Sequence, residues 1–228
     1  MPALPGTVQS ANSGLRGFDI DLILTAARAR DFKKAGYDFC IRYVPRTALL
    51  AEQTHTNLTN AEAIAILDAG LALMVVQHSR KEGWQPTAAL GTTDGQYAVI
   101  YAAQVAELPV GINIWCDLEV VADTATAAGV IAYCQAWYAA VSAGGYVPGL
   151  YVGYGIKISE AQLFNDLPFK HYWSAYNAQI GVETGIYQLL QTDALALSTV
   201  TPDSDKNTFD PNRTETDERG GLPLWLVV

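Results

Sequence analysis

Two spacings of apolar residues alternate along the 228-residue chain, and they predict strands followed by helices. Short runs rich in β-branched and aromatic residues are typical of strands, and longer runs with apolar residues three and four positions apart are typical of helices. The predicted strands are residues 15–21, 38–44, 71–77, 111–119, 150–154, 171–176 and 186–191. The predicted helices are residues 25–35, 59–69, 93–107, 125–143 and 159–167.

The end of the chain gives a weaker pattern. An eighth strand is expected either over residues 195–200 or just before Asp205, with no convincing helix between the seventh and eighth strands. Strand-helix units of about 30 residues indicate a parallel sheet with helices outside, and eight evenly spaced strands favour a closed barrel over an open sheet. We therefore predict an α/β protein, a single (β/α)8 TIM-type barrel with irregular or missing late helices.

The barrel is expected to span residues 15–209, after an N-terminal lead of residues 1–14. A C-terminal extension of residues 210–228 follows, which is polar at first and apolar again over residues 222–228. An exposed apolar tail would adhere to other molecules. We expect this last segment to pack on the barrel or on a delivery or assembly partner.

Composition narrows the class of protein. Half of the residues are apolar and 16% are charged, which fits a sheet buried on both faces and excludes a disordered chain. The net charge is −9, and the basic residues Arg28, Arg30, Lys33 and Lys34 lie together on a predicted surface helix. Nucleic acid is therefore not an expected partner.

No apolar run approaches the roughly 20 residues that span a membrane, and the chain starts without the pattern of a signal peptide. We expect no membrane partner, and a soluble protein that is cytoplasmic when synthesised. Action outside the cell would need another means of release or delivery. Cys40, Cys116 and Cys134 lack the spacing of a zinc site and are expected to be buried, so no metal and no cofactor is predicted.

The apolar run of residues 111–119 ends in two acids, Asp117 and Glu119. Side chains alternate faces along a strand, so the two carboxyl groups point the same way, with Cα atoms roughly 6.5 Å apart. Neighbouring carboxyl groups push each other's pKa values apart and so supply an acid and a base at one pH. The alternative is a strand that ends in solvent with two hydrated acids.

Other predicted strands also end in polar or aromatic groups, and in a β/α barrel the active site lies at the C-terminal strand ends. The polar groups at these ends include Arg46, His78, Gln191 and Asp203. The expected site residues there are Asp19, Asp21, Arg42, Tyr43, Gln77, Asp117, Glu119, Tyr151, Tyr154, Trp173, Tyr176, Gln188, Asp205 and Asn207. The expected catalytic acids are Asp19, Asp117, Glu119 and Asp205, and the other residues of this set are expected to bind substrate.

Several carboxylates beside aromatic rings are typical of a site that hydrolyses a glycan. Aromatic faces stack on sugar rings, one acid protonates the leaving oxygen, and a second carboxylate stabilises or attacks the oxocarbenium-like centre. Two alternatives remain: a module that binds glycan without cleaving it, and a hydrolase whose acids hold a hard divalent cation. Asp19 could also form a structural ion pair with Arg42, and Tyr151 and Trp173 could be ordinary core residues.

Several ordered motifs resemble a known family. Residues 17–19, 35–43, 60–63, 68–71 and 173–176 read GFD, AGYDFCIRY, NAEA, DAGL and WSAY. They resemble the glycoside-hydrolase-like TIM barrels of domain-of-unknown-function family 1906. More distantly, the chain is similar to the family 25 lysozymes, which cleave the bacterial cell-wall glycan. The resemblance covers about residues 15–209.

The resemblance also implies roles. Family 25 lysozymes have an Asp after strand one, an Asp-x-Glu after strand four and an Asp-x-Asn near strand eight. The matching residues here are Asp19, Asp117 with Glu119, and Asp205 with Asn207. The resemblance implies that Glu119 is the general acid and that Asp117 stabilises the reacting centre or orients an N-acetyl group. The predicted function is cleavage of peptidoglycan or a related amino-sugar polymer.

Overall fold

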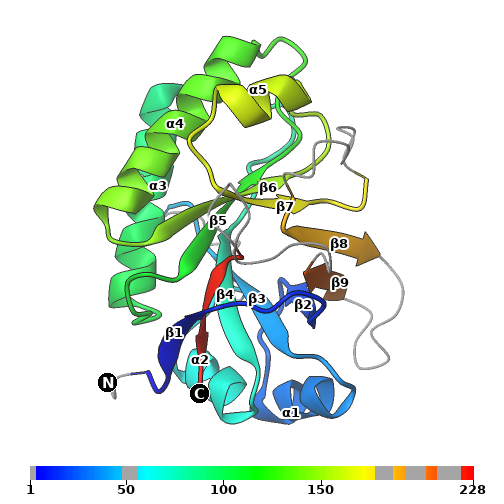
Figure 1. The fold of residues 1–228 in the computed structure, drawn as a ribbon. Helices are drawn as coiled ribbons and strands as arrows, with labels where there is room; N and C mark the ends of the chain where they lie inside the picture. The colour runs from blue at the N-terminus through cyan, green and yellow to red at the C-terminus, as the bar shows by residue number, and fades with distance from the viewer. Residues whose placement is uncertain (1–3, 48–55, 178–186, 194–203, 210–221) are drawn as a thin grey trace.

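The computed structural model describes residues 4–47, 56–177, 187–193, 204–209 and 222–228. Eight of its strands form a closed barrel, and five helices accompany them (Figure 1). The barrel strands are β2 (Arg16–Ile20), β3 (Phe39–Val44), β4 (Ala72–Gln77), β5 (Asn113–Leu118), β6 (Val147–Val152), β7 (His171–Ser174), β8 (Leu189–Asp193) and β9 (Ser204–Phe209). The helices are α1 (Ala26–Lys34), α2 (Asn60–Asp68), α3 (Ala88–Gln104), α4 (Ala127–Ala143) and α5 (Glu160–Asn165).

The closed eight-stranded barrel is confirmed, but its last strand runs the other way. Strands β2 to β8 pair in parallel, whereas β9 is antiparallel to both β8 and β2 and closes the ring between them. The expectation of a wholly parallel sheet was therefore wrong. A parallel connection needs a crossover of a dozen or more residues. Only residues 194–203 separate β8 from β9, too few for that crossover.

This last strand also corrects the position of Asp205. The residue lies within β9 rather than after a strand. The alternative eighth strand over residues 195–200 lies outside the described residues. The predicted division into lead, barrel and extension stays a prediction.

The helices begin where hydroxyl side chains cap them. The hydroxyls of Thr25, Thr59, Thr87, Thr126 and Ser159 accept a hydrogen bond from the backbone N–H of the third helical residue. Such caps satisfy a donor that the first helical turn leaves free. Capping by Thr87 explains why α3 begins earlier than the apolar spacing predicted. None of the helices in the described part of the chain is long and apolar enough to cross a membrane.

Two apolar cores lie on the two faces of the barrel wall. One fills the barrel interior with large side chains such as Trp115, Trp173 and Phe209. The other lies between the barrel and the helices, where Cys116 and Cys134 are buried. All three cysteines are buried and free, as the sequence indicated. The alternation of side chains along each strand decides which polar residues face the barrel axis.

Both ends of the chain close the bottom of the barrel. β1 (Thr7–Ser10) pairs with β10 (Leu224–Val227), and β10 pairs with the start of β4 through Leu226 (Figure 1). Trp225 packs against Phe39 and Phe209 inside the barrel. The backbone N–H of Leu224 donates to the Asn113 side chain at 2.7 Å. The apolar end of the chain is therefore packed on the barrel itself.

A buried ion pair ties the barrel to its first two connections. The Nε atom of Arg42 lies 2.7 Å from Glu62 Oε1, and both side chains are almost fully buried. The same carboxylate accepts from the backbone N–H of Leu24. The guanidinium also donates to the carbonyl oxygens of Ile20 and Thr56. Strands β2 and β3 and helix α2 thus meet at one charge pair.

We predict that Arg42→Met lowers the free energy of unfolding by about 3–5 kcal/mol, because it leaves the buried Glu62 carboxylate without its cation. Urea unfolding followed by circular dichroism measures the change. The control is Lys34→Met, which removes an exposed pair with Asp31 at 3.7 Å and should cost less than about 1 kcal/mol. Equal losses in the two variants would contradict the role given to Arg42.

Candidate active site

Inward-facing polar side chains gather at the C-terminal end of the parallel strands. They come from six strands or their ends and comprise Asp19, Tyr43, Asp117, Glu119, Tyr151, Gln191, Asp205 and Asn207. Because β9 is antiparallel, its first residues reach this end, and Asp205 pairs with Asp19 in register. The four acids predicted to be catalytic therefore stand around one barrel mouth.

Asp19 is the centre of a hydrogen-bond network. It is 3% exposed, and Tyr43 Oη donates to its Oδ2 at 3.0 Å. Asn207 Nδ2 donates to its Oδ1 at 2.7 Å, and Gln191 Nε2 lies 3.4 Å from the same oxygen. Burial raises the pKa of Asp19 to about 6, and the three donors oppose that rise. The carboxyl group therefore titrates close to neutral pH.

The donors around Asp19 are themselves oriented. The indole N–H of Trp173 donates to Asn207 Oδ1 at 2.8 Å, which turns the Asn207 amide N–H₂ toward Asp19. Tyr151 Oη donates to Gln191 Oε1 at 3.1 Å, and Gln191 Nε2 also donates to Asp205 Oδ2 at 2.9 Å. Asp19 and Asp205 are thus linked through one amide.

Asp117 and Glu119 form a second carboxyl pair. Asp117 is buried, and its Oδ1 has no hydrogen-bond partner among the residues that the structure describes. Burial raises the pKa of Asp117 well above its usual range, and the charge of Glu119 raises it further. Burial also raises the pKa of Glu119, while a hydrogen bond from the Ser79 side chain opposes this. The pair therefore disfavours two simultaneous negative charges.

The backbone after β5 fixes the position of Glu119. Val120 has a φ of +47°, a conformation that a β-branched residue rarely adopts. Its N–H donates to Tyr154 O at 2.7 Å, and the Trp84 indole donates to Glu119 O at 2.9 Å. A Cβ atom on Gly153 would lie 2.5 Å from Glu119 Cβ. Glycine at position 153 therefore leaves the space that the Glu119 side chain occupies.

Arg46 supplies the positive charge behind the carboxyl pair. Its guanidinium donates to the carbonyl oxygen of Asp117 at 2.9 Å and to Asp94 Oδ2 at 2.9 Å. Its charge lowers the pKa values of Asp117 and Glu119, but burial has the larger effect on both. The sequence placed Arg46 at a strand end but not among the expected site residues, and it did not indicate Ser79 or Gly153. A glycine at a strand end is a signal for close approach that could have indicated Gly153.

Three predicted binding residues do not face the mouth. Arg42 pairs with Glu62 on the helix side of β3. The Gln77 side chain donates to Asp94 O and accepts from the Trp137 indole between β4 and the helices. Gln188 accepts from the backbone N–H of Tyr172. These positions alternate with inward-facing neighbours, so their side chains point away from the barrel axis. The expectation that all strand-end polar groups converge on the mouth was therefore wrong for these three residues.

Asp21 and Trp173 also differ from the expectation. Asp21 is exposed beyond β2 and bonds to the Thr56 side chain, and burial of part of its surface raises its pKa. Trp173 is 1% exposed and packs edge-on against Trp115 and Tyr151. Its ring lies in the core, and its contribution to the mouth is the hydrogen bond to Asn207. The sequence allowed a structural ion pair between Asp19 and Arg42, but Arg42 pairs with Glu62 instead.

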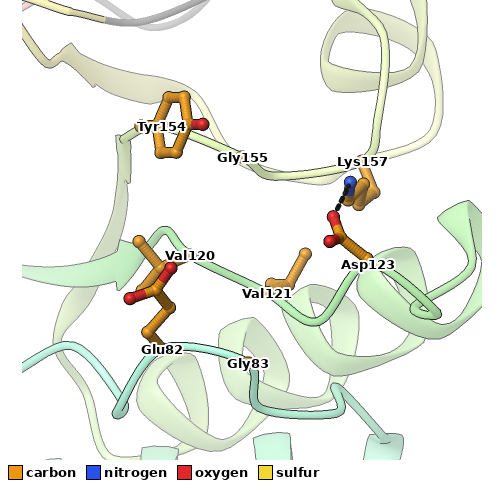
Figure 2. A pocket seen from close by; sticks show the side chains of 8 residues that line it. All are labelled: Glu82, Gly83, Val120, Val121, Asp123, Tyr154, Gly155 and Lys157. Atoms are coloured by element: carbon orange, nitrogen blue, oxygen red, sulfur yellow. Dashed lines mark hydrogen bonds and ion pairs between the residues drawn. The ribbon is translucent and has the colours of Figure 1, made fainter.

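Tyr154 and Tyr176 do offer exposed rings, at 49% and 53% exposure. Tyr154 borders a cavity of about 290 Å³ between the loops that follow β4, β5 and β6. Figure 2 shows its ring on one side, Glu82 opposite, and the ion pair of Lys157 with Asp123 at 2.8 Å. Val120 lines the same cavity, so it adjoins the segment that carries Glu119.

A metal centre would need several ligands close together. Within the described ranges, no group of three or more His, Cys, Asp or Glu side chains is arranged to hold a metal ion. The mouth instead offers carboxyl groups with raised pKa values beside tyrosine and amide groups. Such an arrangement can donate and accept protons.

The chain belongs to the family described as the Rv2525c-like, glycoside hydrolase-like domain, whose model matches residues 30–221. The resemblance to glycoside-hydrolase-like barrels is thereby confirmed. No curated protein matches the sequence.

Solved structures share the fold. The Mycobacterium tuberculosis Tat-secreted protein Rv2525c in complex with L-tartrate is 16% identical, with 87% of this chain and 96% of that chain covered and a TM-score of 0.64. An uncharacterized B. stearothermophilus protein is 21% identical, with coverage of 86% and 96% and a TM-score of 0.64. A muramidase from Trichobolus zukalii is 14% identical, with coverage of 86% and 93% and a TM-score of 0.55. At these identities the likeness is one of fold.

We predict that the Asp19 carboxyl carbon titrates with a midpoint near pH 6 in ¹³C NMR spectra, its signal being the one lost in Asp19→Asn. Asn207→Ala should raise that midpoint, because it removes a donor that favours the ionised form. Thr208→Ala is the control, since its hydroxyl donates to backbone oxygens away from Asp19. A midpoint near the ordinary 3.8, or one unmoved by Asn207→Ala, would contradict the network described here.

The same pKa has a consequence for stability. The folded-state pKa of Asp19 lies above its ordinary value of 3.8, so the folded protein binds this proton more tightly than the unfolded chain does. Protonation of Asp19 makes its full contribution to the free energy of unfolding below about pH 4. This contribution falls as pH rises through 6 and is absent above that. The loss from this one group is about 3 kcal/mol.

Proposed function

We propose that this member of the glycoside-hydrolase-like family hydrolyses peptidoglycan or a related amino-sugar polymer, with Glu119 as general acid and Asp117 as its partner. The observation that carries the proposal is the pair of carboxyl groups on one face of a strand end, in a barrel mouth that also holds Asp19 and Asp205. Both members of the pair have raised pKa values, as general acids need.

Glu119 is the more exposed member of the pair; Ser79 donates a hydrogen bond to it, and Gly153 leaves room for its side chain. In the proposed reaction, Glu119 donates its proton to the glycosidic oxygen as the bond to the anomeric carbon breaks. The oxocarbenium-like centre then needs a nearby negative charge or dipole. In this proposal the ionised Asp19 carboxylate supplies the charge, and the protonated Asp117 carboxyl group supplies the dipole.

Water or a nearby group then completes the substitution at the anomeric carbon. Asp19 is ionised above about pH 6, and Gln191 links it to Asp205. These groups can therefore orient the substrate or the incoming water. The exposed rings of Tyr154 and Tyr176 offer faces on which sugars stack.

The choice of a wall polymer is supported by structural neighbours. A muramidase shares the barrel, and Rv2525c is a Tat-secreted protein. We propose by analogy that this chain also acts on wall material outside the cytoplasm. Trp225 and Leu226 are buried against the barrel, so these two side chains offer little surface to a partner.

Glu119→Gln should lower the rate of wall hydrolysis by about 100-fold or more, since glutamine cannot donate the proton. Release of reducing sugars from purified bacterial walls measures the rate. The matched control is Glu160→Gln in the first turn of α5, which should keep the wild-type rate.

Wild-type activity in Glu119→Gln would contradict the role of this residue. Binding of wall fragments by the wild type without any product would favour the alternative of a glycan-binding module. Abolition of activity by a chelator, with restoration by a divalent ion, would favour a metal-dependent hydrolase.

A further inference from the structure

A second cavity of about 260 Å³ lies beside the carboxyl pair. Its lining residues are Arg46, Thr47, Ser79, Arg80, Lys81 and Trp84. Three of these six are basic, although the chain as a whole has a net charge of −9. We call this cavity the basic pocket.

The charges of the basic pocket are only partly compensated by Asp94. Arg46 Nη1 and Arg80 Nε lie 2.9 Å and 3.0 Å from Asp94 Oδ2, so two guanidinium groups share one buried carboxylate. Lys81 is exposed and has no ion pair with any acid in the described part of the chain. Arg46 also faces Asp117 and Glu119, whose raised pKa values reduce the negative charge they present.

One of the residues that line the pocket, Arg46, also has an unused donor. The Nε atom of Arg46 is buried and has no hydrogen-bond partner within the ranges that the structure describes. A buried N–H without an acceptor costs free energy, which a bound acceptor would recover. A carboxylate or phosphate is the group that best matches a guanidinium, because both can accept two parallel hydrogen bonds.

The two guanidinium groups are held in place before any ligand binds. Their central carbons lie 6.0 Å (Arg46) and 5.8 Å (Arg80) from the centre of the Trp84 ring. The bonds to Asp94 fix the other side of each group. An anion would therefore meet a rigid site and require little ordering of side chains.

The position of the basic pocket connects it to the proposed chemistry. Ser79 lines the pocket, and its side chain is hydrogen-bonded to Glu119. Only the Ser79 side chain would thus separate a group bound in the pocket from the proposed general acid.

We propose that the basic pocket binds an anionic group, a carboxylate or phosphate, carried by the sugar next to the bond that is cleaved. This inference rests on the proposed function for its substrate but not for its test. The lactyl carboxylate of a muramyl sugar that bears no peptide and a phosphate on a wall sugar share the required chemistry. Neutral amino-sugar polymers such as chitin lack it and would be poorer ligands.

The test compares three monosaccharides by NMR titration of the full chain: N-acetylmuramic acid, N-acetylglucosamine 6-phosphate and neutral N-acetylglucosamine. None has a glycosidic bond to cleave, so the result does not depend on catalysis. We expect at least one anionic sugar to bind about tenfold more tightly than the neutral sugar. Preference for the first identifies a carboxylate, preference for the second a phosphate, and preference for both a general anion site.

The double variant Arg80→Gln/Lys81→Gln should remove this preference and leave binding of the neutral sugar unchanged. Arg28→Gln/Arg30→Gln on the exposed face of α1 changes the net charge equally and should keep the preference. Because Asp94 loses a partner in the first variant, Lys81→Gln alone is measured as well and should weaken anion binding several-fold.

Equal binding of all three sugars by the wild type would overturn the proposal. So would an anion preference that survives Arg80→Gln/Lys81→Gln and Lys81→Gln alike, or one that is lost equally in the α1 variant. An anion preference in a protein whose Glu119→Gln variant hydrolyses walls normally would uphold the basic pocket and reject only the catalytic assignment.

Discussion

Burial of carboxyl groups at the barrel mouth is the constraint on which the rest of the site depends. Asp19 and Asp117 are nearly inaccessible to water, and burial is the largest influence on the pKa of each. An unpaired buried charge costs several kcal/mol, so the surrounding residues must either donate hydrogen bonds or hold the group neutral. The two acids differ in their hydrogen-bond donors. Asp19 has three side-chain donors, whereas Asp117 has an oxygen with no partner in the described structure.

The two sides of the mouth are therefore distinct chemical environments: one wall favours an ionised carboxylate near neutral pH, and the other favours a protonated one. The strand that makes the first environment is the antiparallel β9, since it brings Asn207 and Asp205 beside Asp19. The second depends on the turn after β5, where Val120 adopts a rare conformation and Gly153 leaves room for Glu119. Local strain of this kind persists where surrounding bonds fix it, as the bonds to Tyr154 and Gly83 do here.

Much of the fold could be predicted from the apolar spacing, and so could the four acids of the mouth. Strands β3, β4 and β5 have strong patterns because nearly all of their residues are buried. The direction of β9 could not be predicted, since the sequence Ser204–Phe209 is polar and its direction depends on the short connection before it. Strand-end position alone predicts that Arg42 and Gln77 face the mouth, because it does not distinguish inward-facing from outward-facing side chains. The two positions alternate with Tyr43 and Val76, which face inward. Ser79 lies in a loop, where periodicity carries no information about direction, whereas Arg46 follows β3 at a strand end that the sequence indicated.

The most direct test of the central claim is to identify the bond that the protein breaks. Purified wall glycan can be incubated with the protein in H₂¹⁸O and the products separated and weighed by mass spectrometry. Hydrolysis of a glycosidic bond predicts shorter glycans whose new reducing ends each contain one ¹⁸O atom, because water attacks the anomeric carbon. Products without ¹⁸O at the reducing end, cleavage confined to the peptide, or glycan that stays intact would contradict the account.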